Sequence, residues 1–284
     1  MTILLFFGFL PGSEEFKEID LGDRVFILER GPWSDNLTVI DAGPSLIVVD
    51  TWSSPVAAAK AKAIITDRFH QPVSHVINTH HHWDHTFGNQ AFEGAEIVGH
   101  ASCAEDMAKE YSTPAARAQA LEYARSRSQY HSVKDYARSV AADIEKDFRL
   151  TPPRHLIGDR ETLRIGDLTC KLYHAPGLHT RSNLTIFIPE LGLLFTRREF
   201  DGQGLPVLEA GVDLEKLIGS LEDIVGSNRP VKYILMGHGQ PIADPDLRPA
   251  LEFLKGLRTD RKEGRPRNAS PANDSGENKR ICGL

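Results

Sequence analysis

The sequence has little of what marks a secreted, membrane-spanning or nucleic-acid-binding protein. Its 284 residues include only three cysteines, Cys103, Cys170 and Cys282, which are too few and too scattered for a disulfide framework. The net charge of −6 offers no basic field to nucleic acid, so we expect no nucleic-acid partner. The apolar run at residues 3–10 is far too short to span a bilayer, so we expect no membrane partner either.

The same apolar run makes a poor export signal. No basic region precedes it, and Pro11, Gly12 and Ser13 follow it in place of a small-residue cleavage site. We therefore expect a cytoplasmic protein, with a truncated or unusual export signal as the alternative. The hydrophobic content of 40% and charged content of 25% are ordinary for a globular chain of one large or two small domains.

The first hundred residues predict strands, one helix and strands again. Apolar residues that are often β-branched mark the strands, and Pro55 opens an alanine-rich segment with helical spacing. This order indicates an α/β or α+β organisation, with polar residues at a strand's carboxyl end. The expected strands are 24–29, 37–41, 45–50, 73–78 and 95–99, and the expected helix is 55–69.

Residues 101–148 change character and predict two or three helices rich in Ala, Arg, Glu and Lys. One interpretation is an amphipathic helical pair whose arginines are solvated. The other is a cap whose Arg and Tyr side chains, such as Arg125 and Arg127, contact a substrate. Both remain open at this stage.

Strands, a helix and strands recur after residue 160, an order that would suit two similar halves packed face to face. We expect an N-terminal segment over 1–20 and a main domain over 21–258. Almost nothing apolar follows residue 259, so 259–284 is expected to be a disordered tail. The expected strands are 161–164, 167–173, 184–189, 192–196 and 232–236, and the expected helices are 212–225 and 245–257.

A cluster of histidines follows the expected strand 73–78. Four of the twelve histidines and one aspartate fall within the six residues from His80 to His85. His80 and His82 are two residues apart, which on an extended chain places both imidazoles on one face. Asp84 and His85 follow on a turn. Imidazole and carboxylate together suit Zn, Mn or Fe, and no nearby thiolate would make a closed structural zinc site.

The order His-x-His-x-Asp-His after a strand resembles the signature of the metallo-β-lactamase superfamily of hydrolases. This resemblance implies a four-layer αββα sandwich, in which 101–148 is a helical insertion. It also implies a third histidine after a Pro-Gly turn, a place filled by His179, and a last one in a Gly-His-Gly turn, filled by His238. By the same resemblance, one metal belongs to His80, His82 and His179, and a second to Asp84, His85 and His238.

The chain departs from the family pattern at Arg198. Many members have a metal-bridging aspartate there, and a guanidinium cannot ligate a metal. Glu199 or Asp201 could replace it from a shifted loop, or the chain could resemble members that lack the bridge. Alternatively, Arg198 could pair with Asp84 and leave only the first metal tightly held. The resemblance therefore implies one or two Zn²⁺ ions, with Mn or Fe as alternatives.

The expected activity is metal-dependent hydrolysis of a small molecule: a lactam, lactone, ester, thioester or sulfate ester. A zinc-bound hydroxide would be the nucleophile, since zinc lowers the pKa of bound water from about 15.7 towards 7. Asp84 would orient that nucleophile as the catalytic residue, and Arg197 or Arg198 would bind an anionic group of the substrate. The alternatives are a non-catalytic or mononuclear metal-binding member of the fold, or an iron-dependent oxidoreductase.

Four other residues near the motifs have supporting or neutral roles. We expect Asp50, at a strand end, to hydrogen-bond the histidine loop instead of ligating metal. We expect His174 either to lie behind the ligands as well or to be a loop residue with its own hydrogen bonds. His81 and Trp83 occupy alternate positions and should point away from the metal. The substrate and the oligomeric state do not follow from the sequence.

Overall fold

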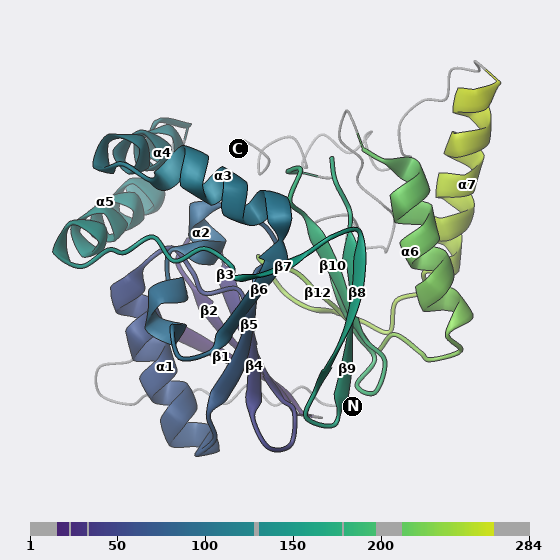
Figure 1. The fold of residues 1–284 in the computed structure, drawn as a ribbon, viewed down its shortest axis with the longest axis horizontal. Coiled ribbons are helices and arrows are strands. Elements are labelled where there is room, and N and C mark those ends of the chain that lie inside the picture. Colours follow the sequence, from purple (N-terminus) through teal and green to yellow (C-terminus); the bar gives the residue numbers. More distant parts are fainter. Residues whose placement is uncertain are drawn as a thin grey trace.

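Two β-sheets pack face to face, with helices covering the outer side of each (Figure 1). This computed structural model of the chain describes residues 16–22, 24–32, 34–127, 131–177, 179–196 and 212–263. The layer order of helices, sheet, sheet and helices confirms the fold class predicted from the sequence. It also brings the ends of distant strands to one rim of the sandwich.

The first sheet has seven strands, which lie side by side in the order of the chain. Its first four strands are antiparallel, whereas β4 to β7 are parallel, so the carboxyl ends of β4, β5 and β6 meet at one edge. Carboxyl ends of parallel strands commonly carry functional loops. The strands are β1 Phe16–Gly22, β2 Val25–Arg30, β3 Asp35–Asp41, β4 Leu46–Val49, β5 Val73–Ile77, β6 Glu96–His100 and β7 His155–Ile157.

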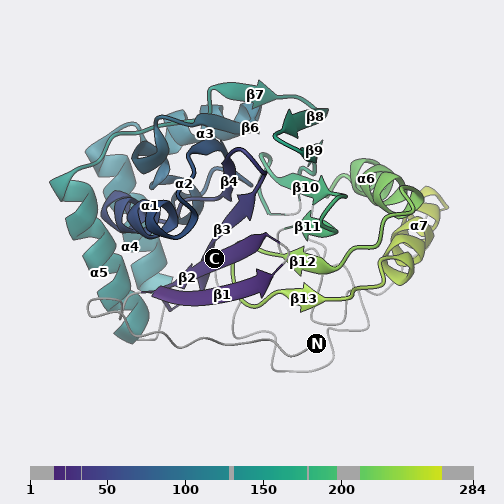
Figure 2. The ribbon, with the colours of Figure 1, turned by 90° about the horizontal axis from the view of Figure 1, so that it is seen from below.

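The second sheet has six described strands in the order β13-β12-β11-β10-β9-β8. Only β11 and β12 are parallel; the other neighbours are antiparallel. Figure 2 shows β1 and β13 together at one edge of the sandwich and β7 and β8 together at the other. The strands are β8 Arg160–Ile165, β9 Leu168–His174, β10 Leu184–Ile188, β11 Leu193–Phe195, β12 Tyr233–Leu235 and β13 Ile242–Ala243.

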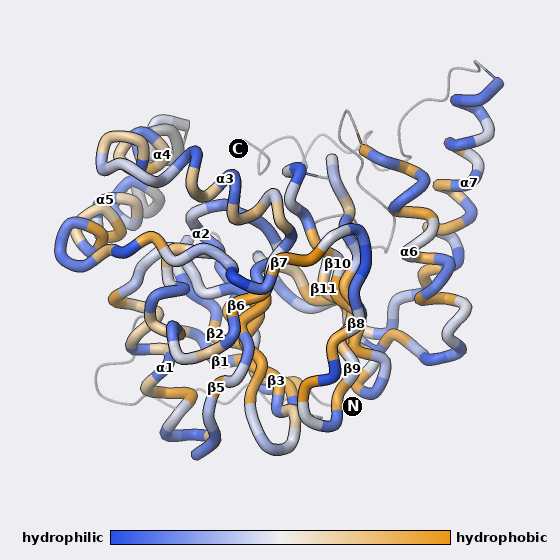
Figure 3. Tube along the Cα trace, viewed as in Figure 1, coloured by the Kyte–Doolittle hydropathy of each residue, from blue (hydrophilic) through white to orange (hydrophobic). Residues whose placement is uncertain are grey.

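The main core lies between the two sheets. Ile40, Val49 and Ile77 of the first sheet are at most 3% exposed and share one apolar cluster with Leu172 and Ile186 of the second. Figure 3 shows this concentration of hydrophobic residues on the central strands. Several strands are buried on both faces. All five residues of β10 are buried, which explains why its sequence is mostly apolar and does not alternate between apolar and polar residues.

Helices form the two outer layers. Ser54 begins α1, because its hydroxyl accepts from the Ala57 N–H at 3.0 Å and Pro55 takes the first turn. No described helix is both long and apolar enough to cross a membrane. The helices are α1 Pro55–Phe69, α2 Trp83–Thr86, the 3₁₀ turn η1 Asn89–Phe92, α3 Ala101–Tyr111, α4 Pro114–Arg127, α5 His131–Lys146, α6 Leu214–Gly226 and α7 Arg248–Lys262.

The 101–148 segment forms α3, α4 and α5, on the side of the first sheet (Figure 1). Its inner face shares an apolar cluster with Trp83 and Phe87 of the histidine loop, and Met107 and Val140 are fully buried within it. The insertion is therefore packed directly against the segment that carries the histidines.

Three strands, one helix end and the short helical segments α2 and η1 differ most from the sequence expectations. β1 begins within the segment 1–20 that was expected to precede the domain. It pairs antiparallel with β2, and Phe16 stacks on Trp52 with ring centroids 5.1 Å apart. The short strands β7 and β13 were not predicted, because their sequences show no clear apolar pattern. Residues 259–262, expected in a disordered tail, are the last turn of α7. Arg258 and Lys262 pair there with Glu215 of α6 at 3.1 and 3.4 Å, which holds that turn in place.

Candidate metal centre

The histidine loop starts at the carboxyl end of β5 and ends in α2. Its two ends are tied together by the buried amides of Asn78 and Asn89, which exchange hydrogen bonds of 3.0 and 2.8 Å. His80 and His82 lie on the extended part, and α2 begins one residue after His82. The sequence motif therefore becomes a strand end followed by a single helical turn.

Three histidines meet on one side of this loop. His80 and His82 come from the loop itself, and His179 comes from the turn after β9. One nitrogen of each lies within 4.8 Å of one nitrogen of the others, and His179 Nε2 is 2.9 Å from His82 Nδ1. His80 is fully buried, whereas the other two are partly exposed. These three rings could hold a metal ion that remains open to solvent on one side.

A second triad adjoins the first and consists of Asp84, His85 and His238. Asp84 Oδ2 lies 3.3 Å from His85 Nε2 and 3.2 Å from His238 Nε2, and the two nitrogens are 3.1 Å apart. Ligands about 2.0–2.1 Å from a tetrahedral zinc ion are separated by about 3.3 Å. All three separations match that value within about 0.2 Å, so the residues fit a zinc ion. The ring centroids of His80 and His85 are 4.2 Å apart, which places the triads side by side.

The charge balance of the second triad also favours a cation. Burial lowers the pKa of His85, but the carboxylates of Asp84 and Asp50 raise it more, to about 10. Burial raises the pKa of Asp84, but His85 and His238 lower it more. The pKa of the carboxyl therefore lies well below its usual value, and the group is ionised. The His85 imidazole thus lies beside two carboxylates, and a metal cation could take the place of its proton.

Asp50 fixes both the histidine loop and one imidazole of the second triad. Its Oδ1 accepts the Thr79 N–H at 2.8 Å, and its Oδ2 accepts the Thr79 hydroxyl at 2.7 Å and lies 2.8 Å from His85 Nδ1. The Thr79 hydroxyl oxygen is also 3.0 Å from His80 Nδ1. With its Nδ1 directed at a carboxylate, His85 presents Nε2 to the triad. The structure thus places Asp50 behind the candidate ligands, as the sequence suggested.

His238 is held by β3, a contact that the sequence did not reveal. Asp35 Oδ1 lies 2.9 Å from His238 Nδ1, and Asp35 and His238 also form an isolated antiparallel bridge. The Asn36 side-chain amide donates to Met236 O and Gly239 O at 2.9 and 2.8 Å, on either side of the Gly-His-Gly turn. The sequence contains one sign of this contact, because the polar residues Asp35 and Asn36 stand at the start of a buried strand. Only the fold shows that they face the His238 turn.

Gly237 leaves no room for a side chain beside the second triad. An added Cβ would lie 2.4 Å from His85 Cε1, closer than real Cβ atoms approach their neighbours. We expect Gly237→Ala to push the His85 ring aside, because Cε1 lies between the nitrogen held by Asp50 and the nitrogen of the triad. Zinc affinity at the second triad should fall about tenfold or more, with a loss of about 1–3 kcal/mol of stability.

A chelator-competition titration with Zn²⁺, together with thermal unfolding, measures both effects. Gly94→Ala is the matched control, because nothing lies within 4 Å of its added Cβ. Equal zinc affinity of the two variants would contradict the expectation.

His81 points away from both triads, as expected for an alternate position. Its Nδ1 lies 3.1 Å from Ser182 Oγ and its Nε2 lies 3.3 Å from Glu110 of α3. Burial lowers the pKa of His81 more than Glu110 and Asp106 raise it. The buried ring therefore links the loop to the insertion.

His174 does not lie behind the candidate ligands. Its ring stacks on His100 with centroids 3.5 Å apart, and its Nε2 is 2.7 Å from Arg181 O. Its Nδ1 faces Asp159 and Lys216 at 3.5 and 3.3 Å. The end of β9, where His174 lies, precedes the His179 turn by five residues, and that turn brings His179 rather than His174 to the metal centre.

Several predicted residues lie outside the described part of the chain. Arg197, Arg198, Glu199 and Asp201 fall in residues 197–211, and the side chains of Arg125 and Arg127 are not described either. The expected roles of these residues remain predictions.

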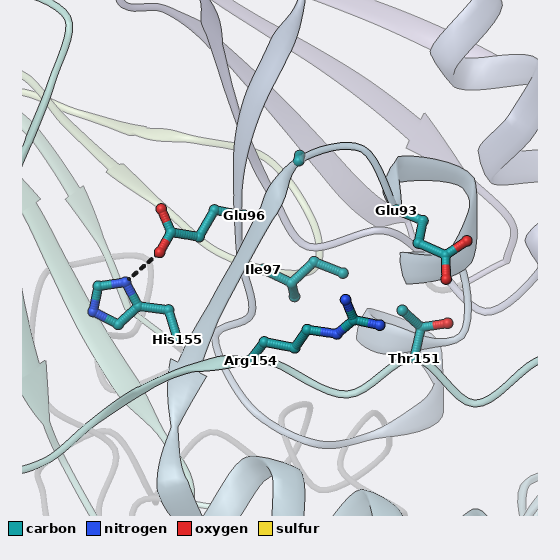
Figure 4. Close-up of a pocket in the computed structure, with 7 residues that line it drawn as sticks. Glu93, Glu96, Ile97, Thr151, Arg154 and His155 are labelled. Atoms are coloured by element: carbon teal, nitrogen blue, oxygen red, sulfur yellow. Dashed lines mark hydrogen bonds and ion pairs between the residues drawn. The ribbon is translucent and has the colours of Figure 1, made fainter.

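A cavity of about 330 Å³ lies beside the start of β6 (Figure 4). It is lined by Glu96 and Ile97 at the start of β6, by Arg154 and His155 beside β7, and by Thr151, Glu93 and Ala95. The triads follow the carboxyl end of β5, which runs parallel to β6. The cavity therefore belongs to the opposite end of these strands.

Comparison with known proteins gives one family and several similar folds. The model of the metallo-beta-lactamase superfamily matches residues 30–196. No curated protein sequence matches the chain.

Among solved structures, the stereoselective inverting sec-alkylsulfatase Pisa1 from Pseudomonas sp. has a TM-score of 0.61 at 18% identity, covering 86% of this chain and 41% of that one. A metallo-beta-lactamase from Pontibacter korlensis has a TM-score of 0.59 at 17% identity, covering 85% and 99%. At these identities the likeness concerns the fold, and the chain spans about two fifths of the length of the alkylsulfatase.

Proposed function

Because the chain belongs to the metallo-beta-lactamase superfamily, we propose that it is a metal-dependent hydrolase of a small molecule. The observation that carries this proposal is the meeting of six candidate ligands, from the histidine loop, the His179 turn and the His238 turn, in two adjoining triads. Zinc is the proposed ion, because imidazole and carboxylate donors at these separations suit it. Manganese and iron use similar donors and are tested below.

The proposed chemistry divides between the ions and the protein. A divalent ion bound there would lower the pKa of water and polarise a substrate carbonyl or sulfate oxygen. His80, His82 and His179 would hold the first ion, and Asp84, His85 and His238 the second. Asp84 is 5% exposed and its lowered pKa keeps it ionised. Its carboxylate can therefore ligate the second ion and accept a hydrogen bond from the attacking water.

The partly exposed rings of His82 and His179 indicate where a substrate would approach. Both rings belong to the first triad, while His80 and His85 are buried behind them. His238 of the second triad is also partly exposed, so a substrate could reach either ion. The substrate class is proposed as a lactam, lactone, ester, thioester or sulfate ester, and the Pisa1 and Pontibacter korlensis enzymes make sulfate esters and lactams the first two to try.

Metal analysis followed by a substrate panel tests this proposal. The metal content of protein purified without added metal would be measured first. Chromogenic lactam, lactone, ester, thioester and sulfate ester substrates would then be assayed before chelation, after chelation, and after adding back Zn²⁺, Mn²⁺ or Fe²⁺. We expect turnover of at least one class, its loss on chelation and its recovery with one metal.

Other outcomes distinguish the alternatives. Bound metal without turnover of any substrate would favour a non-catalytic member of the fold. Iron in the purified protein, together with oxygen consumption in the presence of thiols, would instead favour an oxidoreductase.

A further inference from the structure

A tyrosine of the helical insertion reaches a buried carboxylate near the second triad. Tyr136 of α5 is 9% exposed, and its ring packs so closely on Gly31 that an added Cβ there would be 2.8 Å from two ring atoms. The Tyr136 hydroxyl donates to Asp35 Oδ2 at 2.8 Å and lies 2.8 Å from Ser53 Oγ. Because the tyrosine proton is directed at Asp35, the Ser53 hydroxyl is the donor in the second contact.

Asp35 depends on the partners of its two oxygens. The residue is fully buried, and a buried carboxylate without partners is costly. Tyr136 donates to Oδ2, while Oδ1 lies 2.9 Å from His238 Nδ1 in an ion-pair contact that does not have the angle of a hydrogen bond. Burial and the neighbouring carboxylate raise the pKa of Tyr136 well above its ordinary value, so its hydroxyl keeps the proton that it donates.

Asp35 lies beside the nitrogen of His238 that faces away from the triad. A carboxylate beside Nδ1 favours a proton on that nitrogen and leaves the Nε2 lone pair free. His238 Nε2 lies 3.2 Å from Asp84 Oδ2 and 3.1 Å from His85 Nε2. The contacts therefore run from Ser53 through Tyr136 and Asp35 to a candidate ligand of the second triad.

We propose that Tyr136 is a positioning residue for an ion at the second triad, because its hydroxyl orients Asp35 and Asp35 orients His238. The inference rests on the proposed function only in that an ion occupies Asp84, His85 and His238. It gives the helical insertion a role in shaping the metal centre from behind. This role differs from direct contact between the insertion and the substrate.

Stepwise zinc binding by the full chain tests the role of Tyr136. Metal-free wild type and Tyr136→Phe would be titrated with Zn²⁺ against a chromophoric chelator, and His238→Ala would identify the binding step that belongs to the second triad. For Tyr136→Phe we expect that step to weaken about 10–100-fold, with the other step unchanged within twofold. Ser53→Ala should weaken the same step by a smaller factor.

Tyr173→Phe is the matched control. It removes a tyrosine hydroxyl that also donates to a carboxylate, that of Asp223, on the α6 side of the second sheet. Both binding steps should remain at their wild-type values in this variant. The circular dichroism spectrum and melting temperature of each variant would establish that it is folded.

The possible failures are separable. Unchanged binding in Tyr136→Phe, or equal weakening of both steps, would overturn the inference. If Tyr136→Phe does not fold, Ser53→Ala decides instead, and an unchanged second step overturns it. A wild type that binds one ion and turns over substrate would overturn the inference but not the proposed function. Two ions, a selective loss in Tyr136→Phe and no turnover would support the inference and refute the proposed hydrolase.

Discussion

Asp84→Asn is expected to lower kcat/KM by about 10²–10⁴-fold for any substrate that the protein hydrolyses. Asparagine preserves the shape of the side chain but removes the negative charge between His85 and His238. The carboxylate is 5% exposed, and both imidazole nitrogens lie within 3.3 Å of its Oδ2. An ion at this place would lose its only anionic ligand among the three, and the attacking water would lose its charged acceptor.

The measurement combines kinetics with metal content. Asp84→Asn should bind one equivalent of Zn²⁺ less than wild type, or bind the second equivalent far more weakly, while keeping the first. Asp106→Asn is the control: Asp106 is a similarly buried carboxylate, 6% exposed, which pairs with Arg181 and not with either triad. Asp84→Asn with more than a tenth of wild-type activity and both zinc equivalents would contradict the assignment of Asp84.

The family resemblance was sufficient to predict the two triads, because the residues that carry it follow fixed local patterns. His80 to His85 stand at a strand end, and the two distant histidines sit in turns rich in glycine and proline. The fold then places those turns beside the loop, since β9 and β12 are in the sheet that faces β5. Such patterns are set by neighbours in the chain, so they can be read without the fold.

The supporting residues could be predicted only in part. Asp50 follows the apolar strand β4 and precedes α1. A single carboxylate at the end of an apolar strand was enough to predict that it supports the histidine loop. Asp35 and Tyr136 meet across 101 residues, and Asp35 in turn meets His238 only because β3 lies beside the His238 turn. No local pattern records such a meeting. Of the two alternatives for His174, the structure favours a residue with hydrogen bonds of its own, because its ring stacks on His100 and its Nε2 lies 2.7 Å from Arg181 O.

The edges of the fold were predicted least well for a similar reason. β7 and β13 have three and two residues, too few for a periodic pattern to show. The last turn of α7 is almost wholly polar, and ion pairs with Glu215 hold it, so its composition suggested a tail. A prediction based on the spacing of apolar residues misses elements that are stabilised by charged partners distant in the sequence.

Asp50→Asn is expected to lower the free energy of unfolding by about 2–4 kcal/mol and zinc affinity at the second triad by about 10–100-fold. The carboxylate accepts from the Thr79 N–H and hydroxyl and lies 2.8 Å from His85 Nδ1. An amide can keep the backbone contact, but its NH₂ group then faces His85. A proton on His85 Nδ1 would meet another donor, so the ring would move its proton to Nε2 and lose the lone pair that a metal needs.

Thermal unfolding with and without zinc separates the two effects of Asp50→Asn. In the metal-free state, the melting temperature reports the loss of the buried hydrogen bonds. The additional stabilisation by saturating Zn²⁺ reports affinity, since a ligand of the folded state stabilises by RT ln(1 + [L]/Kd). We expect both quantities to fall in Asp50→Asn.

Asp159→Asn is the matched control for Asp50→Asn. It makes the same chemical change beside a different histidine, because Asp159 lies 3.5 Å from His174 Nδ1 and outside both triads. Its zinc-dependent stabilisation should equal that of wild type. If Asp50→Asn were destabilised yet gained as much from zinc as wild type, Asp50 would support only the fold of the loop. The orientation of His85 would then have to come from the packing of α2 alone.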